Sequence, residues 1–304
     1  MKISLIVHTA YPDYIGGREH HVHYLAERLA ATNDVYVISG AAVSKTSRTR
    51  RDGYTLIRTP MRSITVSRKP LQIYRFLPQV KKQIQILHPD IIHAFEYGSE
   101  STYAAYRYAR RHTIPFILTV YGYQFNTLIL KSLKLIYDQF FGKKMFLHAA
   151  RIFCPSETQR NEILHKFRPG NRFHISRKIS IQANSIDIDS FRDIRPDSKL
   201  RSQYALPQEL VLSSIARILP RKGIRILIQA LSRMMQRKDV PPFKLLVIGP
   251  ECGERSDLIA LSRSLKLNTI IYFIGSVAYK DIRKYISITD IFILPSLYEG
   301  LPLA

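Results

Sequence analysis

Short apolar segments alternate with amphipathic segments from one end of the chain to the other. Val22, Leu25, Ala26 and Leu29 recur at the spacing of one helical face, which predicts a helix over residues 18–30. Short runs rich in Val and Ile predict strands between such helices. In the first half these runs are KISLIV, DVYVIS, PDIIHAF, FILTVYG, ARIFCPS and KISIQAN. Strands that alternate with helices indicate parallel sheets covered on both faces.

The second half of the chain repeats the same alternation of predicted strands and helices. Strands are expected in ELVLSSIA, FKLLVIGP, TIIYFIGS and DIFILPS, with helical segments between them. At 304 residues the chain is long enough for two cores. We therefore predict an α/β protein with two Rossmann-like domains, residues 1–193 and 194–304, of which the second ends before a helix covers its last strand.

The chain is strongly basic, with 46 Lys and Arg against 23 Asp and Glu and a net charge of +23. Residues 45–82 carry eleven Lys or Arg and one acid, Asp52, interleaved with apolar and aromatic residues. This mixture suits a membrane surface with anionic lipid, a nucleic acid, or an ordinary solvated basic face. No apolar run approaches the length that spans a bilayer, and two cysteines form no disulfide framework.

Candidate chemistry lies where strands end, because ligands of open α/β sheets bind beyond the carboxyl ends of the strands. After the first strand, Gly16 and Gly17 precede a helix, where backbone N–H groups would face a phosphate. A tight turn explains the same pair. In the second half, Arg217 and Lys222 flank a loop that ends at Gly223, and they suit a diphosphate or are two exposed cations.

The last predicted strand is followed by PSLYEGLPLA, in which Glu299 and Gly300 lie just before the expected start of a helix. The carboxylate of Glu299 suits the hydroxyl groups of a sugar. Gly300 would let the following backbone N–H groups approach a phosphate.

An ordered set of motifs resembles the GT-B glycosyltransferases of family 4. The resemblance runs from the first strand to the last residue, and its final motif is the most specific. The motifs are IGGREHHV, PDIIHAF, PSETQRNEI, ANSIDIDSF, ARILPRKG, LLVIGP, YFIGSV and DIFILPSLYEGLP. The resemblance implies retaining transfer of a sugar from a nucleotide-diphosphate donor, in a cleft between an N-terminal acceptor domain and a C-terminal donor domain.

The resemblance also assigns roles to single residues. Arg217 and Lys222 would hold the donor diphosphate, and Glu299 would contact hydroxyls of the donor sugar. The remaining donor contacts would come from Gly16, Gly17, Gly275, Gly300 and Leu301. The basic stretch 45–82 resembles the membrane-docking part of enzymes that use lipid-linked acceptors.

Two departures from the family pattern stand out. Tyr121 occupies the position of a usual histidine near the reacting centre, so it offers a hydrogen bond but no cation at neutral pH. A family glutamate eight residues beyond Glu299 would fall past Ala304, so we expect a C-terminally truncated chain.

Histidines and acids elsewhere carry weaker signals. His93 is expected at the end of a strand, where it would line the acceptor side. A histidine that only forms a hydrogen bond at the strand end explains the same position equally well. The pair His20 and His23 has no evident third ligand, and Asp187 and Asp189 are read as turn residues, so no metal or other cofactor is expected.

The leading hypothesis is a glycosyltransferase of surface polysaccharide or glycolipid synthesis, cytoplasmic or peripheral on the inner face of the membrane. Its expected partners are a nucleotide sugar, a glycan or lipid-linked acceptor and an anionic membrane surface. An inactive nucleotide-sugar-binding relative is the first alternative, motivated by Tyr121 and the chain end. The second alternative, a nucleic-acid-binding protein, is motivated by the net charge alone, and no nucleic-acid partner is expected.

Overall fold

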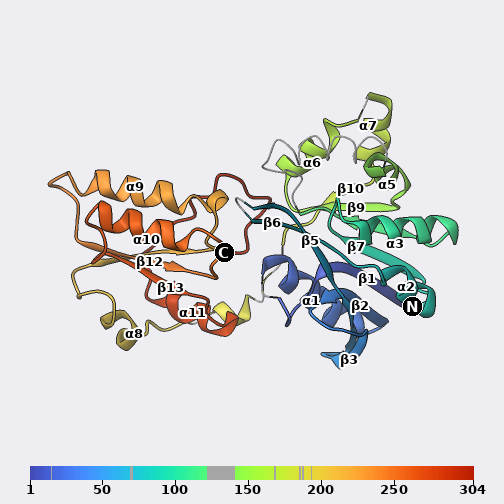
Figure 1. Ribbon diagram of the computed structural model, residues 1–304, viewed down its shortest axis with the longest axis horizontal. Helices are drawn as coiled ribbons and strands as arrows, with labels where there is room; N and C mark the ends of the chain where they lie inside the picture. The colour runs from blue at the N-terminus through green and yellow to red at the C-terminus, as the bar shows by residue number, and fades with distance from the viewer. Residues whose placement is uncertain are drawn as a thin grey trace. The chain divides into compact units, whose positions relative to one another are not determined.

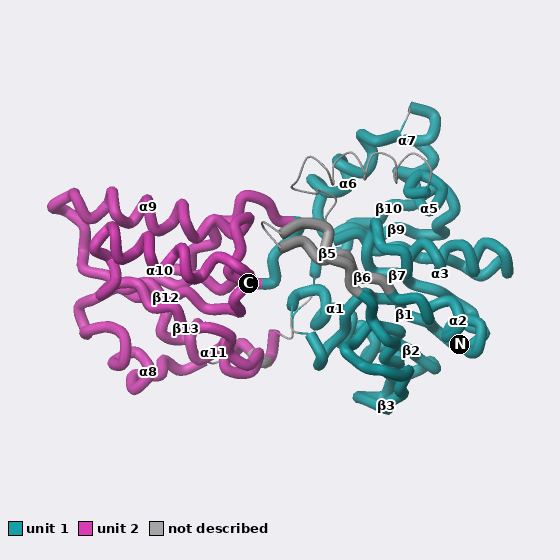
Figure 2. Tube along the Cα trace, viewed as in Figure 1, with its two compact units in different colours: residues 1–186, 300–303 teal, residues 187–299, 304 magenta. Residues whose placement is uncertain are grey.

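The computed structural model divides into two compact units, residues 1–186 with 300–303 and residues 187–299 with 304 (Figure 2). It describes residues 1–14, 16–68, 71–121, 141–167, 169–184, 186, 188–192 and 194–304, with side chains except those of 63–76 and 190. The domain boundary expected near residue 193 falls outside the described residues. None of the described helices is both long and apolar enough to cross a membrane.

Unit 1 is built on an eight-stranded sheet with helices on both faces (Figure 1). Its strands are β1 (Lys2–Thr9), β2 (Asp34–Ala41), β3 (Ser47–Arg51), β4 (Tyr54–Pro60), β7 (Ile91–Phe95), β8 (Phe116–Thr119), β9 (Arg151–Cys154) and β10 (Ile179–Ile181). Its helices are α1 (Gly17–Ala30), α2 (Val80–Leu87), α3 (Glu100–Arg111), α5 (Lys143–His148), α6 (Glu157–Leu164) and α7 (Pro169–Ser176). The sheet order is β10-β9-β8-β7-β1-β2-β4-β3, and its pairs are parallel except β3 with β4.

Neighbouring residues of β1 face opposite sides of the sheet and are buried on both. Ile6 joins the core beneath α2, α3, α5 and α7, whereas Leu5 and Val7 join the core with Val22 and Ala26 of α1. Burial on both faces explains why Leu5, Ile6 and Val7 are apolar in succession instead of alternating with polar residues.

The basic stretch 45–82 contains structure that the apolar pattern did not predict. It forms β3 and β4, an antiparallel pair β5 (Arg62–Arg68) and β6 (Leu71–Phe76), and the start of α2. Four of the five residues of β3 are exposed, because β3 is an edge strand without a buried face. The side chains of 63–76 lie outside the described part, so this part of the expected membrane contact stays a prediction.

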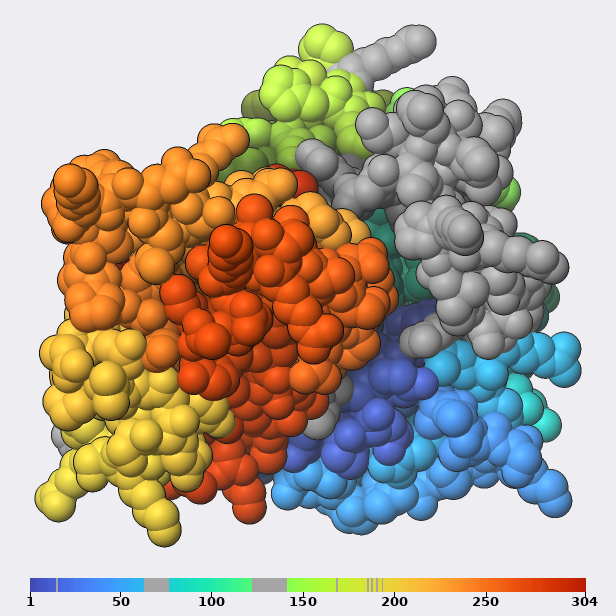
Figure 3. Space-filling view, turned by 60° about the vertical axis from the view of Figure 1, so that its left-hand side comes forward, coloured from blue at the N-terminus to red at the C-terminus, as the bar shows by residue number. Residues whose placement is uncertain are grey.

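Unit 2 has a four-stranded parallel sheet in the order β13-β12-β11-β14. Its elements are α8 (Ser198–Ser202), β11 (Leu210–Ile215), α9 (Ile224–Met234), β12 (Phe243–Ile248), α10 (Arg255–Ser264), β13 (Ile271–Gly275), α11 (Tyr279–Ser287) and β14 (Ile291–Phe292), with 3-10 turns η2 (Asp189–Phe191) and η3 (Pro220–Lys222). Figure 1 shows α9 and α10 on one face of this sheet and α8 and α11 on the other. Orange and red residues, among them α10 and α11, form a continuous face of this unit (Figure 3).

The predicted fold class is confirmed as two Rossmann-like units with mostly parallel sheets. In β12, Leu245 and Val247 pack beneath α9 and α10, whereas Leu246 and Ile248 pack beneath α8 and α11. Ser156 is the N-cap of α6, since its hydroxyl accepts a hydrogen bond from the Gln159 N–H at 3.3 Å. The last predicted strand is shorter than expected and contains only Ile291 and Phe292.

Candidate functional site

Three adjacent strands of unit 1 bring their carboxyl ends to one edge of the sheet. β1 lies between β2 and β7, and β7 pairs in turn with β8. Because the strands are parallel, Thr9, Glu96 and Tyr121 at or just after their ends share that edge with the start of α1. A ligand site is expected at this edge, because ligands of open α/β sheets bind beyond the carboxyl ends of the strands.

Arg18 joins these strand ends and was not predicted. Its Nη2 donates to Thr9 Oγ1 and Glu19 Oε1, each at 2.8 Å, and its Nη1 lies 2.9 Å from Glu96 Oε2. Burial alone would lower the pKa of Arg18, but Glu96 and Glu19 together raise it above its ordinary value. Glu96 has φ +145°, a strained backbone for a residue with a side chain. Arg18 therefore links the ends of β1 and β7 to the start of α1.

Gly16 and Gly17 begin α1 as predicted, but the carboxylate of Glu19 already lies against them. A Cβ on Gly16 would lie 2.5 Å from Glu19 Oε2, so glycine leaves room for this carboxylate. Burial would raise the pKa of Glu19, yet Arg18 and the hydrogen bond from Thr9 lower it, so the group is ionised. A phosphate at this helix start would meet that negative charge, and the phosphate contact of the two glycines stays a prediction.

His93 lies on β7 and is buried. Its Nε2 is 2.7 Å from Thr119 Oγ1, and its ring stacks on Phe95 with centroids 4.0 Å apart. Burial lowers the pKa of His93 to about 3, and the nearby charge of His21 contributes. The ring is therefore neutral at physiological pH, and its expected acceptor role stays a prediction.

We expect His93 to make folding sensitive to acid. In the unfolded chain the imidazole of His93 is protonated near pH 6.5, whereas in the folded protein it stays neutral down to about pH 3. Its contribution to the free energy of unfolding is therefore complete above pH 6.5 and decreases as the pH falls below that value. At pH 5 the loss from this group is about 2 kcal/mol. Urea unfolding at pH 7 and pH 5 measures it. His93→Gln should lose about 2 kcal/mol less on acidification than the native protein, and an equal loss would contradict the assignment.

Tyr121 brings a phenol to this edge of the sheet. Its hydroxyl is buried and has no hydrogen-bond partner among the residues that the structure describes. The ring lies 5.7 Å from His21 and 6.4 Å from Phe95, measured between centroids. Burial raises its pKa well above the usual range, so the phenol stays protonated and offers a hydrogen bond.

In unit 2, two loops from distant parts of the sequence pack together beyond the carboxyl ends of β11 and β14. Gly223 ends η3 with φ +70°, and a Cβ there would lie 2.0 Å from the carbonyl oxygen of Pro295. The N–H of Leu297 donates to the carbonyl of Arg221 at 2.9 Å. Only glycine permits this approach, so Gly223 sets the contact between the loops.

The contact brings the predicted residues Lys222 and Glu299 together. Lys222 Nζ forms an ion pair with Glu299 Oε1, and the hydroxyl of Ser296 donates to the same oxygen at 2.7 Å. The side chains of Lys222 and Glu299 are 12% and 22% exposed, so the pair is accessible to a ligand at its rim. Ser296 was not predicted, although it stands in the same motif.

Arg217 and Arg221 add positive charge beside this pair. Arg217 is exposed at the end of β11, as predicted from its place in the chain, whereas Arg221 is half-buried and was missed. Burial lowers the pKa of Arg221, the charge of Arg217 lowers it further, and Glu299 raises it. An arginine stays charged regardless, so Arg217 and Arg221 add two positive charges beside the Lys222–Glu299 pair. Such an excess favours an anionic ligand.

The other predicted donor residues have definite positions. Gly275 ends β13 with φ +86° and open space where a Cβ would stand. Gly300 and Leu301 group with unit 1, where the Asn184 side-chain amide donates to the Leu301 carbonyl at 2.7 Å. Their contacts with a donor stay predictions. Within the described part of the chain no three His, Cys, Asp or Glu side chains gather closely enough to hold a metal ion.

Two family models match the chain. The one described as "Glycosyltransferase Family 4" covers residues 15–189, and the one described as "Glycosyl transferases group 1" covers residues 197–304. The chain is 23% identical over 220 residues to an Escherichia coli UDP-Gal:alpha-D-GlcNAc-diphosphoundecaprenol alpha-1,3-galactosyltransferase. That match covers 71% of this chain and 54% of the galactosyltransferase, so the chain spans about half the length of this relative.

Solved structures share the fold over nearly the whole chain. Anabaena Alr3699/HepE in complex with UDP and glucose matches with a TM-score of 0.70 and 18% identity, covering 99% of this chain and 76% of that one. Sucrose-phosphate synthase from Thermosynechococcus elongatus matches with a TM-score of 0.72 and 18% identity, covering 99% and 77%. At this identity the likeness establishes the two-unit α/β fold alone.

Proposed function

Because the chain belongs to glycosyltransferase family 4, we propose that the complete protein transfers a sugar from a nucleotide-diphosphate donor to a glycan or lipid-linked acceptor. The observation that carries this proposal is the arrangement in unit 2. Lys222, Glu299 and Ser296 form one hydrogen-bonded cluster, and Arg217 and Arg221 add charge beside it. The cluster offers cations to a diphosphate and a carboxylate to sugar hydroxyls.

The chemistry needs charge stabilisation more than proton transfer. As the bond between the anomeric carbon and the diphosphate oxygen breaks, the leaving group gains negative charge. The acceptor oxygen then bonds to the anomeric carbon on the same face, and its proton passes to the departing phosphate. Fixed cations at Lys222, Arg217 and Arg221 would stabilise the departing diphosphate without a metal. No cofactor is part of this proposal.

A structural neighbour, a relative and the basic stretch 45–82 motivate the choice of donor, acceptor and cellular location. The Anabaena protein was crystallised with UDP and glucose, so UDP-sugars are the first donors to test. The Escherichia coli relative acts on a diphosphoundecaprenol-linked sugar, so a lipid-linked acceptor is the first to offer. With such an acceptor we place the protein at the cytoplasmic face of the membrane, where residues 45–82 would meet anionic lipid.

The test offers labelled UDP-galactose and UDP-glucose to the complete protein, with a lipid extract as acceptor. We expect label to enter the lipid fraction, and NMR of the product should show the anomeric configuration of the donor. Calorimetry runs alongside. Donor binding without transfer or hydrolysis would favour the inactive, nucleotide-sugar-binding alternative, and absence of both binding and transfer would reject the proposal.

Tyr121→Phe separates a functional hydroxyl from a structural one. The native hydroxyl is buried without a partner among the described residues, so its removal should leave the unfolding free energy unchanged or slightly higher. If the hydroxyl donates to the donor sugar, transfer should fall about fivefold or more, since a lost hydrogen bond to substrate costs about 1 kcal/mol or more. Parallel urea unfolding and transfer assays decide. Unchanged transfer would remove Tyr121 from the site.

A further inference from the structure

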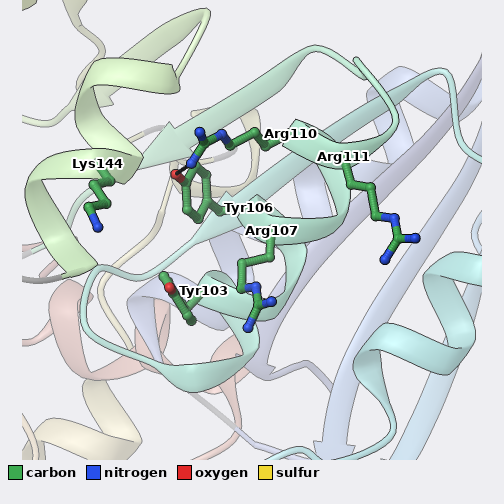
Figure 4. A pocket seen from close by; sticks show the side chains of 6 residues that line it. All are labelled: Tyr103, Tyr106, Arg107, Arg110, Arg111 and Lys144. Carbon is green, nitrogen blue, oxygen red and sulfur yellow. Dashed lines mark hydrogen bonds between the residues drawn. The ribbon is translucent and has the colours of Figure 1, made fainter.

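A cavity of about 290 Å³ on unit 1 is lined almost entirely by basic and aromatic side chains (Figure 4). It lies against α3 and α5. Its lining residues are Tyr103, Tyr106, Arg107, Arg110, Arg111 and Lys144. None of these six is acidic, so the described lining residues carry four positive charges and no negative one.

The helical repeat explains why these side chains converge. Residues 103, 107, 110 and 111 follow the i, i+4, i+7, i+8 spacing of one face of α3, and Lys144 comes from the first turn of α5. The opposite face of α3, with Ala105 and Ala109, is fully buried against the sheet. The basic face therefore points outward from the core.

Within the part of the chain that the structure describes, no carboxylate neutralises these cations. Arg107, Arg111 and Lys144 form no ion pair with any residue in the described ranges, and Arg110 Nη1 approaches only the Tyr106 hydroxyl, at 3.4 Å. By contrast, Arg18 and Arg58 elsewhere in unit 1 each bind a carboxylate. The helix C-terminus favours positive charge in the last turn, which covers Arg110 and Arg111 but neither of the other two.

A histidine beside the cavity is affected by the same positive charge. The His148 ring lies 5.4 Å from that of Tyr106. Burial lowers the pKa of His148, and the charges of Arg110 and Lys178 lower it further. The positive potential therefore extends beyond the side chains that line the cavity.

The cavity is separate from the predicted transfer site. α3 connects the parallel strands β7 and β8 and so runs opposite to them. Its last turn, with Arg110 and Arg111, thus lies toward the amino ends of the strands, whereas Tyr121 lies just beyond the carboxyl end of β8. A ligand here would contact a different part of unit 1.

We propose that this cavity is a second anion site, which binds a phosphate group. Guanidinium groups bind phosphate oxygens in pairs, the ammonium of Lys144 adds a point charge, and the tyrosine hydroxyls supply neutral donors. The phosphate belongs either to a soluble phosphate compound or to the headgroup of an anionic phospholipid. The site goes beyond the proposed transfer reaction, whose diphosphate would lie in unit 2.

The experiment compares two triple variants of the complete protein. Arg107→Gln, Arg111→Gln and Lys144→Gln together remove three charges from the cavity, while Lys199→Gln, Lys238→Gln and Arg263→Gln remove three exposed charges from unit 2. One arm titrates inorganic phosphate by calorimetry at low salt. The other measures co-sedimentation with vesicles of phosphatidylcholine alone or mixed equally with phosphatidylglycerol.

The outcomes separate the two sources of phosphate. If the ligand is soluble, the cavity variant should bind inorganic phosphate at least about tenfold more weakly than the control variant. If it is a headgroup, the cavity variant should lose about a hundredfold in affinity for the phosphatidylglycerol vesicles, since each of the three basic side chains near the surface contributes about 1 kcal/mol, or about fivefold. Circular dichroism checks folding. Equal binding by both variants in both arms, or no binding by the native protein in either, overturns the site.

Discussion

Lys222→Ala should reduce sugar transfer by the complete protein about a hundred- to a thousandfold, the loss expected when one preorganised group is removed from a developing anion. Lys222 lies at the end of η3 and pairs with Glu299, so its removal also frees the carboxylate that we expect to hold the donor sugar. Steady-state assays with saturating UDP-sugar measure the change in kcat. Arg217→Ala should act in the same direction, because its charge lies on the same loop.

Two comparisons make this result specific. Lys238→Ala removes an exposed cation of the same unit and should leave transfer unchanged. Glu299→Gln keeps the size of the side chain but removes the negative charge that pairs with Lys222, so it should also lower transfer. The ion pair lies near the surface, and its loss should cost about 1 kcal/mol of stability or less. Near-native transfer by Lys222→Ala or Arg217→Ala, with the protein folded, would contradict the assignment.

The alternation of strands and helices was predictable because it depends on which residues are buried, and buried residues are mostly apolar in the sequence. Strands such as β1 and β12 are buried on both faces and contain the uninterrupted apolar runs LIV and LLVI. β3 was not predictable in this way, since its residues SRTRR are nearly all exposed and are held by backbone pairing with β4. Edge strands of this kind carry little apolar signal.

The predicted site residues were found by their place at strand ends, but their partners were not. The sequence indicated Lys222 and Glu299 separately, and the resemblance placed both at the donor, yet neither source indicated that they pair with each other. Arg18 and Glu96 were missed because 78 residues separate them, although the structure places their charged atoms 2.9 Å apart. Local patterns report the type of an element, whereas such pairs depend on which strands become neighbours.

Gly223→Ala should destabilise unit 2 and abolish transfer together, because this glycine sets the contact between the two loops of the donor site. An alanine Cβ would lie 2.0 Å from the Pro295 carbonyl oxygen, which is backbone and must shift. The residue would also keep φ +70°, which costs about 1 kcal/mol for a residue with a side chain. We expect a total loss of about 3 kcal/mol or more in the unfolding free energy, measured by urea unfolding.

Gly253→Ala is the matched control, because it isolates the backbone cost from the steric one. Gly253 has φ +98° in the same unit, but nothing lies within 4 Å of the place that an alanine Cβ would take, so the substitution should cost about 1 kcal/mol. The difference between the two variants is the contribution of the contact with Pro295. If both variants lose the same stability, or if Gly223→Ala keeps native transfer, the two loops do not depend on close packing, and the cluster of Lys222 and Glu299 is not positioned as we describe.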